Sequence, residues 1–223
     1  MIKLQSLVDR HQQDFLYSGK LDSDQFLAFN SIKICRTAEA DGHLYDCDDC
    51  GGLRYLYHSC GHRFCPNCQN FNTTKWLYRQ KQRLLPCDYY MITFTIPREL
   101  RRTPRSQRKQ FYKALFDAAS ETLKKLTRTK LNGECGALAV LHTNSRNLDD
   151  HPHIHFIVPG LVLKKDLAVK ITGKFFLHYN PLRELFRGKL LAKLKDLQIA
   201  FPGYLYGKKW NVHCEKKGNG SSC

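Results

Sequence analysis

The sequence predicts an α+β fold in which short helices and a cysteine-rich module precede an antiparallel sheet packed with helices. Three observations lead to this prediction. Six of the ten cysteines lie between positions 35 and 68, apolar residues recur at helical spacing in several segments, and β-branched or aromatic runs occur between positions 89 and 158. With 223 residues, 42% hydrophobic and 25% charged, the chain has the composition of a folded protein and not of a disordered one.

The expected elements follow in order along the chain. Apolar positions predict helices over 3–17 and 22–32, with Gly19 ending the first. Turn residues fill the cysteine module, and a further helix is expected over 72–85, stopped by Pro86.

The second half alternates between strands and basic helices. A strand is expected over 89–96 and a long amphipathic helix over 104–129. Two strands, 136–143 and 153–158, are joined by a short polar turn and therefore predict an antiparallel hairpin. A basic helix is expected over 181–197.

These patterns divide the chain into three parts. We expect a helical and metal-binding domain over 1–86, a sheet domain over 87–215 and a frayed tail over 216–223. No apolar run approaches the ~20 residues that span a bilayer, and the first residues lack the apolar core of a secretory signal. We therefore expect a cytoplasmic protein with no membrane partner.

The cysteine spacing predicts structural zinc. Cys47 and Cys50 form one C-x-x-C pair, and Cys65 and Cys68 form a second. Two such pairs supply the four thiolates of a tetrahedral zinc site, which leaves no open position for catalysis. A thioredoxin-like redox pair is the competing interpretation, and the presence of two pairs argues against it.

Further ligand types lie close by in the same segment. Cys35, His43, Cys60 and His62 would complete a second tetrahedral site, with His58 as an additional candidate. The alternative is that Cys35 and Cys60 are small buried core residues.

Three alternating histidines predict a different kind of metal site. Side chains two positions apart share one face of a strand, so His153 and His155 would stand side by side. Two neighbouring imidazoles can hold one divalent ion. His151 would extend the row, although Pro152 is expected to end the strand.

The positive charge predicts a polyanionic partner. Lys and Arg outnumber Asp and Glu by 16, and half of this excess lies between positions 98 and 130. Such density suits contacts to nucleic-acid phosphates, whereas a plain solvated helix face is the alternative. The residues expected to bind DNA are Arg101, Arg102, Arg105, Arg108, Lys109 and Lys113.

Together these motifs make the chain resemble the HUH transposases of the rolling-circle insertion-sequence class, which carry an N-terminal zinc-binding domain. The matching blocks are Cys35-Arg36-Thr37, Gly42-His43, Cys47-Asp48-Asp49-Cys50-Gly51, Ser59-Cys60, Cys65-Pro66-Asn67-Cys68-Gln69, Lys75-Trp76-Leu77, 94–100, 139–143, 151–160 and 185–189. The resemblance implies a zinc-ribbon-like module, then an antiparallel sheet of the Rep/relaxase type with His153 and His155 on a central strand. It implies Mg²⁺ or Mn²⁺ on these histidines, single-stranded DNA as substrate and a tyrosine nucleophile. Candidates for the third ligand are His151 and His142.

Two departures from the family pattern bear on activity. Phe64 occupies a position where relatives often have histidine, and His62 is the candidate substitute. Relatives continue past Trp210, and their nucleophile lies in that later part, whereas Tyr204 and Tyr206 precede it. The resemblance thus implies a sheet domain incomplete at its C-terminus and a truncated transposase that binds DNA without nicking it. The alternatives are a non-catalytic zinc-containing nucleic-acid-binding protein and, less favoured, a zinc hydrolase.

Overall fold

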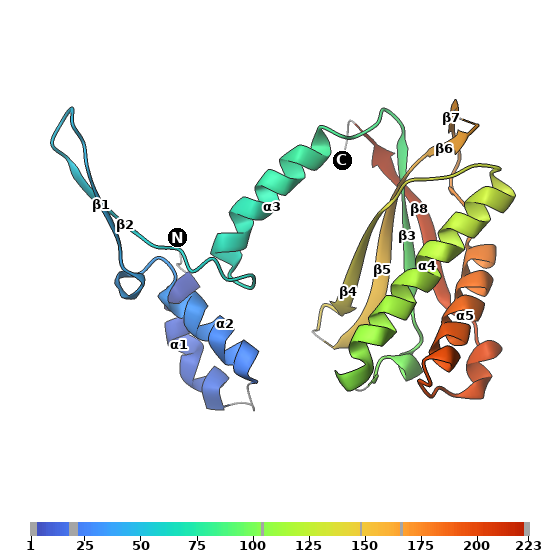
Figure 1. Cartoon of the computed structure of the whole chain (residues 1–223), viewed down its shortest axis with the longest axis horizontal. Coiled ribbons are helices and arrows are strands. Elements are labelled where there is room, and N and C mark those ends of the chain that lie inside the picture. The colour runs from blue at the N-terminus through green and yellow to red at the C-terminus, as the bar shows by residue number, and fades with distance from the viewer. Residues whose placement is uncertain (1–3, 18–21, 104, 148, 166, 221–223) are drawn as a thin grey trace. The chain divides into compact units, whose positions relative to one another are not determined.

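The computed structural model describes residues 4–17, 22–103, 105–147, 149–165 and 167–220 (Figure 1). The chain forms two compact units, residues 1–84 and 85–223, and each is described by itself. Unit 1 contains the cysteine module, and unit 2 contains the histidine strand.

Two packed helices begin unit 1. Helix α1 (Leu4–Tyr17) lies beside α2 (Ser23–Ile34), and the rings of Phe15 and Phe29 stack at 5.0 Å. A capping box starts α2, because the Asp22 carboxylate accepts from the Gln25 amide while the Gln25 side chain accepts from the Asp22 amide. Both helices agree with the sequence prediction to within about two residues, the usual precision of helix boundaries.

The cysteine module is built from a hairpin between helix ends. After the short 3₁₀ turn η1 (Ala38–Ala40), strands β1 (Gly42–Asp46) and β2 (Leu53–Tyr57) pair antiparallel, and helix α3 (Pro66–Lys81) follows. The helix that the sequence predicts over 72–85 begins six residues earlier in the structure, at Pro66, and ends at Lys81. Pro66 occupies the first turn of α3, where its fixed φ suits a helix and its missing amide costs nothing.

Unit 2 is a four-stranded antiparallel sheet in the order β4-β5-β3-β8, with two helices on one face (Figure 1). The strands are β3 (Asp88–Thr95), β4 (Leu138–Asn144), β5 (Asp150–Pro159) and β8 (Asn211–Asn219). The covering helices are α4 (Arg108–Lys130) and α5 (Tyr179–Asp196). The smaller elements are η2 (Arg98–Leu100), η3 (Arg105–Gln107), β6 (Leu161–Lys164), β7 (Leu167–Lys170) and η4 (Gly203–Tyr206).

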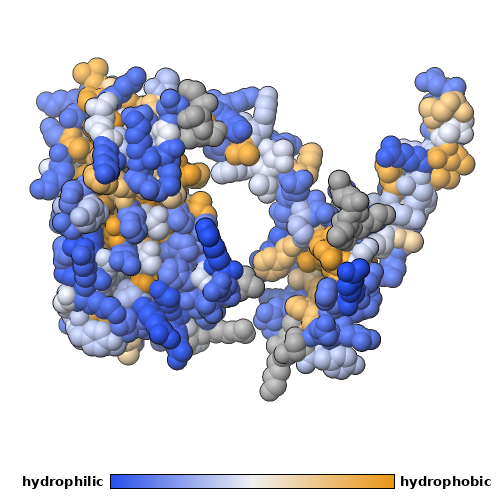
Figure 2. All heavy atoms as spheres, turned by 180° about the vertical axis from the view of Figure 1, so that it is seen from behind, coloured by the Kyte–Doolittle hydropathy of each residue, from blue (hydrophilic) through white to orange (hydrophobic). Residues whose placement is uncertain are grey.

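The sheet has one buried face and one open face. Along β3 the side chains of Ile92 and Phe94 are fully buried beneath the helices, whereas those of Thr93 and Thr95 are only half-buried on the opposite side. Strand β5 alternates in the same way. The α+β class with an antiparallel sheet is thus confirmed. Seen from the side away from α4 and α5, hydrophilic residues prevail and apolar residues form smaller patches (Figure 2).

Two local predictions are wrong. Pro152 lies inside β5 and does not end it, because it sits at an irregularity of the β4–β5 ladder and beyond the last residue that pairs with β3, where no amide is required. Residues 216–219 belong to β8, paired with β3, and are not part of a frayed tail. The last predicted tail residues, 221–223, lie outside the described residues.

Candidate metal centres

Three histidines converge on the open face of the sheet. His153 and His155 alternate with buried Ile154 on β5, and His142 on β4 lies directly opposite His153 in the antiparallel register. One ring nitrogen from each of the three lies within 4.8 Å of the others. The ring centroids are 4.7 to 5.1 Å apart. The structure thus adds His142, and not His151, to the expected pair.

Hydrogen bonds orient two of these rings. His153 Nδ1 lies 2.6 Å from the carbonyl oxygen of His151, and since a carbonyl only accepts, Nδ1 donates and Nε2 keeps its lone pair. His155 Nδ1 bonds the hydroxyl of Thr93 at 3.0 Å, across the β3–β5 ladder. Partners of this kind fix the ring of a ligating histidine and leave its other nitrogen for a metal ion.

The surroundings favour the neutral form of His155 and of the nearby His151. Burial lowers the pKa of His155, and the neighbouring rings of His153 and His142 lower it further. Burial also lowers the pKa of His151, together with the charge of Arg101. A metal ligand must be unprotonated, so an environment that disfavours imidazolium favours metal binding.

The donor set fits a first-row transition ion bound at an open site. Imidazole nitrogen suits such ions, whereas Mg²⁺ takes oxygen ligands in near-octahedral geometry. Three nitrogens leave coordination positions for water or substrate oxygen. The group lies on the half-exposed side of the sheet, where such oxygens can reach it.

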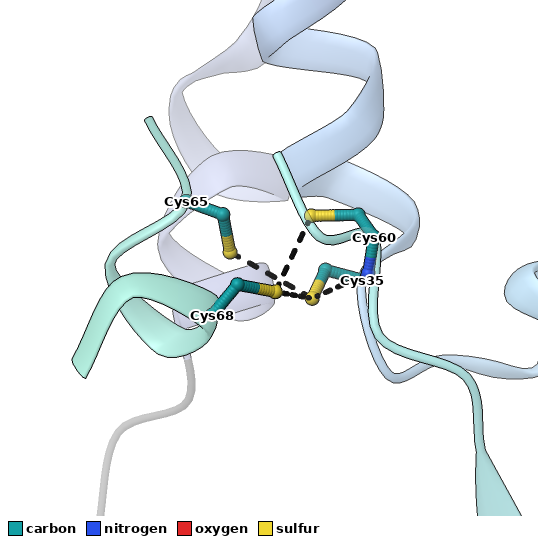
Figure 3. Close-up of side chains that lie close together, drawn as sticks. All are labelled: Cys35, Cys60, Cys65 and Cys68. Carbon is teal, nitrogen blue, oxygen red and sulfur yellow. Dashed lines mark hydrogen bonds between the residues drawn. The ribbon is translucent and has the colours of Figure 1, made fainter. Parts of the chain in front are cut away.

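Four cysteines form a second cluster in unit 1 (Figure 3). Cys35 is the C-cap of α2, Cys60 lies in the loop after β2, Cys65 is the N-cap of α3, and Cys68 follows in its first turn. All four sulfur atoms lie within 4.8 Å of one another, and Cys35 and Cys65 are fully buried.

The sulfur spacing fits a tetrahedral ion. Cys68 Sγ lies 3.6 Å from both Cys35 Sγ and Cys60 Sγ, and Cys65 Sγ lies 3.7 Å from Cys35 Sγ. Zinc–sulfur bonds of about 2.3 Å place the corners of a tetrahedron about 3.8 Å apart. A disulfide would require about 2.05 Å. The geometry and donor type therefore match structural zinc.

Burial disfavours the thiolate form of two of the four cysteines. Burial raises the pKa of Cys60 to about 12, and it also raises the pKa of Cys35. Burial acts in the same direction on Cys68, but hydrogen bonds from Cys35 and Cys60 outweigh it and lower that pKa to about 7. A divalent cation supplies the charge that lets the remaining thiols ionise.

The structure contradicts the predicted pairing of the two C-x-x-C motifs. Cys47 and Cys50 are exposed at the turn of the β1–β2 hairpin, and no third ligand joins them among the described residues. The five residues of β1 extend about 17 Å, which carries Cys47 away from the base of the hairpin. Cys35 and Cys60 take their places beside Cys65 and Cys68.

The predicted second tetrahedral site is not assembled either. Two of its members, Cys35 and Cys60, belong to the four-cysteine cluster. His43 packs against His58 with ring centroids 4.6 Å apart, and His62 Nδ1 accepts from the Phe64 amide at 3.2 Å. Neither His43 nor His62 joins a metal-ligand group in the described part of the chain.

The basic residues expected to bind DNA separate into paired and unpaired side chains. Arg108 forms a 2.7 Å ion pair with Asp150, and Lys113 forms a 2.6 Å ion pair with Asp117. In the described part of the chain, no carboxylate forms an ion pair with Arg101, Arg102 or Lys109. The side chain of Arg105 lies outside the described residues.

Sequence comparison places these clusters in a family. Residues 7–96 match the family model described as "Transposase zinc-binding domain", and residues 136–222 match the one described as "Putative transposase". The first match contains the four-cysteine cluster and the second contains the three histidines. The chain belongs to this transposase family.

Two curated transposases are similar to the chain. It is 36% identical over 187 residues to "Putative transposase y4qJ" of Sinorhizobium fredii. This alignment covers 82% of the chain and 46% of that protein. It is 32% identical over 225 residues to "Transposase for insertion sequence element IS801" of Pseudomonas savastanoi pv. phaseolicola, covering 91% and 53%. The chain spans about half the length of these relatives.

A solved relaxase structure was also matched. The conjugative relaxase TrwC, in a metal-bound complex with oriT DNA, aligns with a TM-score of 0.43 and 18% identity over 55% of the chain and 47% of TrwC. In the described part of this transposase-family chain, no helix combines the length and apolar character needed to cross a bilayer.

Proposed function

We propose that this chain is the DNA-binding and metal-binding part of a transposase that nicks single-stranded DNA and transfers the strand. The three-histidine cluster on the open sheet face carries this proposal. It is supported by the positively charged chain and by the family to which the chain belongs.

The histidines would act by positioning. His142, His153 and His155 would hold a divalent transition ion, with Mn²⁺ favoured over Mg²⁺ by the nitrogen donors. When bound, such an ion polarises a phosphoryl oxygen and neutralises charge that develops on the phosphate. Thr93 and the carbonyl of His151 fix the rings that point at it.

The chemical step would be an in-line attack by a tyrosine oxygen. The attacking oxygen forms a bond to phosphorus, the bond to the 3′ oxygen breaks, and that oxygen takes a proton to give a free 3′-hydroxyl. The product carries a 5′-phosphotyrosine bond, and a 3′-hydroxyl can attack this bond in the strand-transfer step.

Tyr204 is poorly suited to this role. Its hydroxyl donates to Glu99 at 2.9 Å, and this bond raises the pKa of Tyr204 and so opposes formation of the nucleophilic phenolate. We therefore propose that Tyr204 is not the tyrosine that attacks DNA.

Zinc would have a structural role in unit 1. Cys35, Cys60, Cys65 and Cys68 would bind it with all four positions filled, tying the ends of α2 and α3 to the loop after β2.

Manganese binding tests the proposal. The zinc-loaded full chain is titrated with Mn²⁺ and followed by electron paramagnetic resonance, alongside His155→Ala and the control His213→Ala. His213 lies on the same open face, opposite Thr93, but outside the cluster. We expect wild type and His213→Ala to bind Mn²⁺ and His155→Ala to lose it. Absence of Mn²⁺ binding by wild type, with DNA binding intact, would favour the non-catalytic nucleic-acid-binding alternative.

A nicking assay tests the role of the tyrosines. Wild type, Tyr204→Phe and Tyr206→Phe are incubated with single-stranded DNA and Mn²⁺, and covalent protein–DNA product is measured on denaturing gels. We expect Tyr204→Phe to give as much of this product as wild type does. An adduct that disappears in one variant would identify that tyrosine as the nucleophile.

A further inference from the structure

A positively charged pocket lies beside the histidine cluster. It has a volume of about 360 Å³ and is formed by the loop after β3, the start of β5 and the start of β8. Its lining includes four cationic side chains and no carboxylate. The cations are Arg98, Arg101, Lys208 and Lys209.

The strand register makes the pocket continuous with the histidines. Thr95 lines the pocket and lies opposite His153 on one side and Asn211 on the other. In the next open-face row, Thr93 lies between His155 and His213, which also lines the pocket. The pocket therefore lies within about two strand spacings, roughly 10 Å, of the three-histidine cluster.

One cation in the pocket has an unmet hydrogen bond. Arg101 Nε is enclosed and has no hydrogen-bond partner among the described residues. None of the described carboxylates pairs with Arg98, Arg101 or Lys209. No described carboxylate neutralises the Arg101 guanidinium that lines the pocket, so a bound anion would supply the missing counter-charge.

The backbone that presents the lysines is firmly held. Trp210 is 2% exposed, donates from Nε1 to the Leu205 carbonyl and packs its ring on Phe186. Arg187 donates to the Lys208 carbonyl at 3.0 Å. The ammonium group of Lys208 bonds Glu99 at 2.6 Å, so the uncompensated charge of the pocket lies on Arg98, Arg101 and Lys209.

We propose that this pocket binds a backbone phosphate of single-stranded DNA next to the phosphate that the histidine site engages. The inference rests on the proposed function and deepens it by assigning Arg101 and Lys209 as phosphate contacts. Its size, its cations and its place along the sheet suit a phosphodiester of an extended strand that continues across β3 toward β8.

Salt-dependent binding tests the assignment without any cleavage. Fluorescein-labelled oligo(dT) is titrated with zinc-loaded wild type, Arg101→Gln, Lys209→Gln and the control Lys195→Gln over a range of salt concentrations and without Mn²⁺. Lys195 is an exposed cation on α5, which covers the other face of the sheet. Each pocket variant should reduce the slope of log K against log salt by about 0.7, and the control should leave it unchanged.

Two further probes distinguish sources of phosphate. On an oligo(dT) strand with an uncharged methylphosphonate backbone, wild type and the pocket variants should bind equally. Equal slope changes in Lys195→Gln and Lys209→Gln would overturn the proposal, since they indicate diffuse attraction only. Inorganic phosphate that binds wild type but not Lys209→Gln, with unchanged oligonucleotide affinity, would also overturn it.

The design separates this proposal from the proposed function. Lys209 is exposed, so Lys209→Gln keeps the test valid if Arg101→Gln fails to fold. Loss of Mn²⁺ binding concerns the histidines alone, whereas the salt slope concerns the pocket alone. Either result can fail while the other holds.

Discussion

The two ligand clusters differ in what holds them together. The cysteines come from two helix ends and a loop, and the hairpin between them exposes every residue of β2. The histidines stand on two adjacent strands of a four-stranded sheet whose other face is a packed core. We therefore expect the first cluster to depend on a bound ion for its geometry, whereas backbone pairing by itself positions the second.

If the proposed function is correct, this difference separates a stabilising site from a reactive one. Four thiolates saturate a tetrahedral ion, so the ion acts only as a cross-link. Three imidazoles on an open face leave positions for substrate, and the rigid sheet keeps their geometry suited to repeated binding and release.

Removal of zinc by a chelator should give the largest difference in stability between unit 1 and unit 2. Removal of zinc from the full chain should unfold the module around α2, the hairpin and α3, because structural zinc contributes about 10–16 kcal/mol of apparent binding free energy. Hydrogen exchange measured by mass spectrometry should then rise in unit 1 and stay unchanged in the sheet of unit 2. Equal protection of unit 1 with and without zinc would refute its dependence on the ion.

Single cysteine substitutions sharpen the ligand assignment. Cys35→Ser should abolish stoichiometric zinc binding, because Cys35 Sγ contacts the cluster, whereas Cys47→Ser should retain it. Zinc content by elemental analysis after dialysis measures both. The reverse result would restore the pairing of the two C-x-x-C motifs.

Removal of a ring-orienting hydroxyl should weaken the histidine site without unfolding it. Thr93→Val deletes the 3.0 Å bond to His155 Nδ1 and should reduce Mn²⁺ affinity about 10–100-fold. Thr95→Val is the matched control, since Thr95 lies on the same face opposite His153. Equal affinities of the two variants would mean that the Thr93 bond has no positioning role.

The smallest expected effect concerns acid stability of unit 2. Hydrogen bonds from Lys189 and Lys193 lower the pKa of Glu121 to about 2, which links α4 to α5. Because the folded pKa is depressed, this stabilisation is present above the unfolded value of 4.5 and is lost as pH falls toward 2. Glu121 is partly exposed, so Glu121→Gln should cost only about 0.2–1 kcal/mol at neutral pH.

Urea unfolding of unit 2 at several pH values measures this effect. The difference between wild type and Glu121→Gln should shrink below about pH 4. A constant difference down to pH 2 would show that charge on Glu121 is not its source.

Local sequence patterns predict most of the helices and strands, because the formation of a helix or strand depends largely on residues that are near in sequence. The core strands and amphipathic helices of unit 2 follow directly from their apolar periodicity. The sequence does not predict strand β8, although Val212 and Cys214 alternate inward between polar residues, because its two lysines and the Gly and Asn after them resemble a solvated tail. The β1–β2 hairpin was missed because both of its strands bury almost nothing.

Ligand identity in this protein came from the sequence, and ligand partnership came from the tertiary structure. Thiols at 65 and 68 and imidazoles at 153 and 155 are close along the chain, so their spacing alone marked them as candidate ligands. The other members of each cluster come from distant segments. Cys35 lies at the end of α2, and the register of β4 against β5 places His142 opposite His153. Spacing along a chain fixes only short-range geometry, whereas helix packing and strand pairing decide which remote side chains meet.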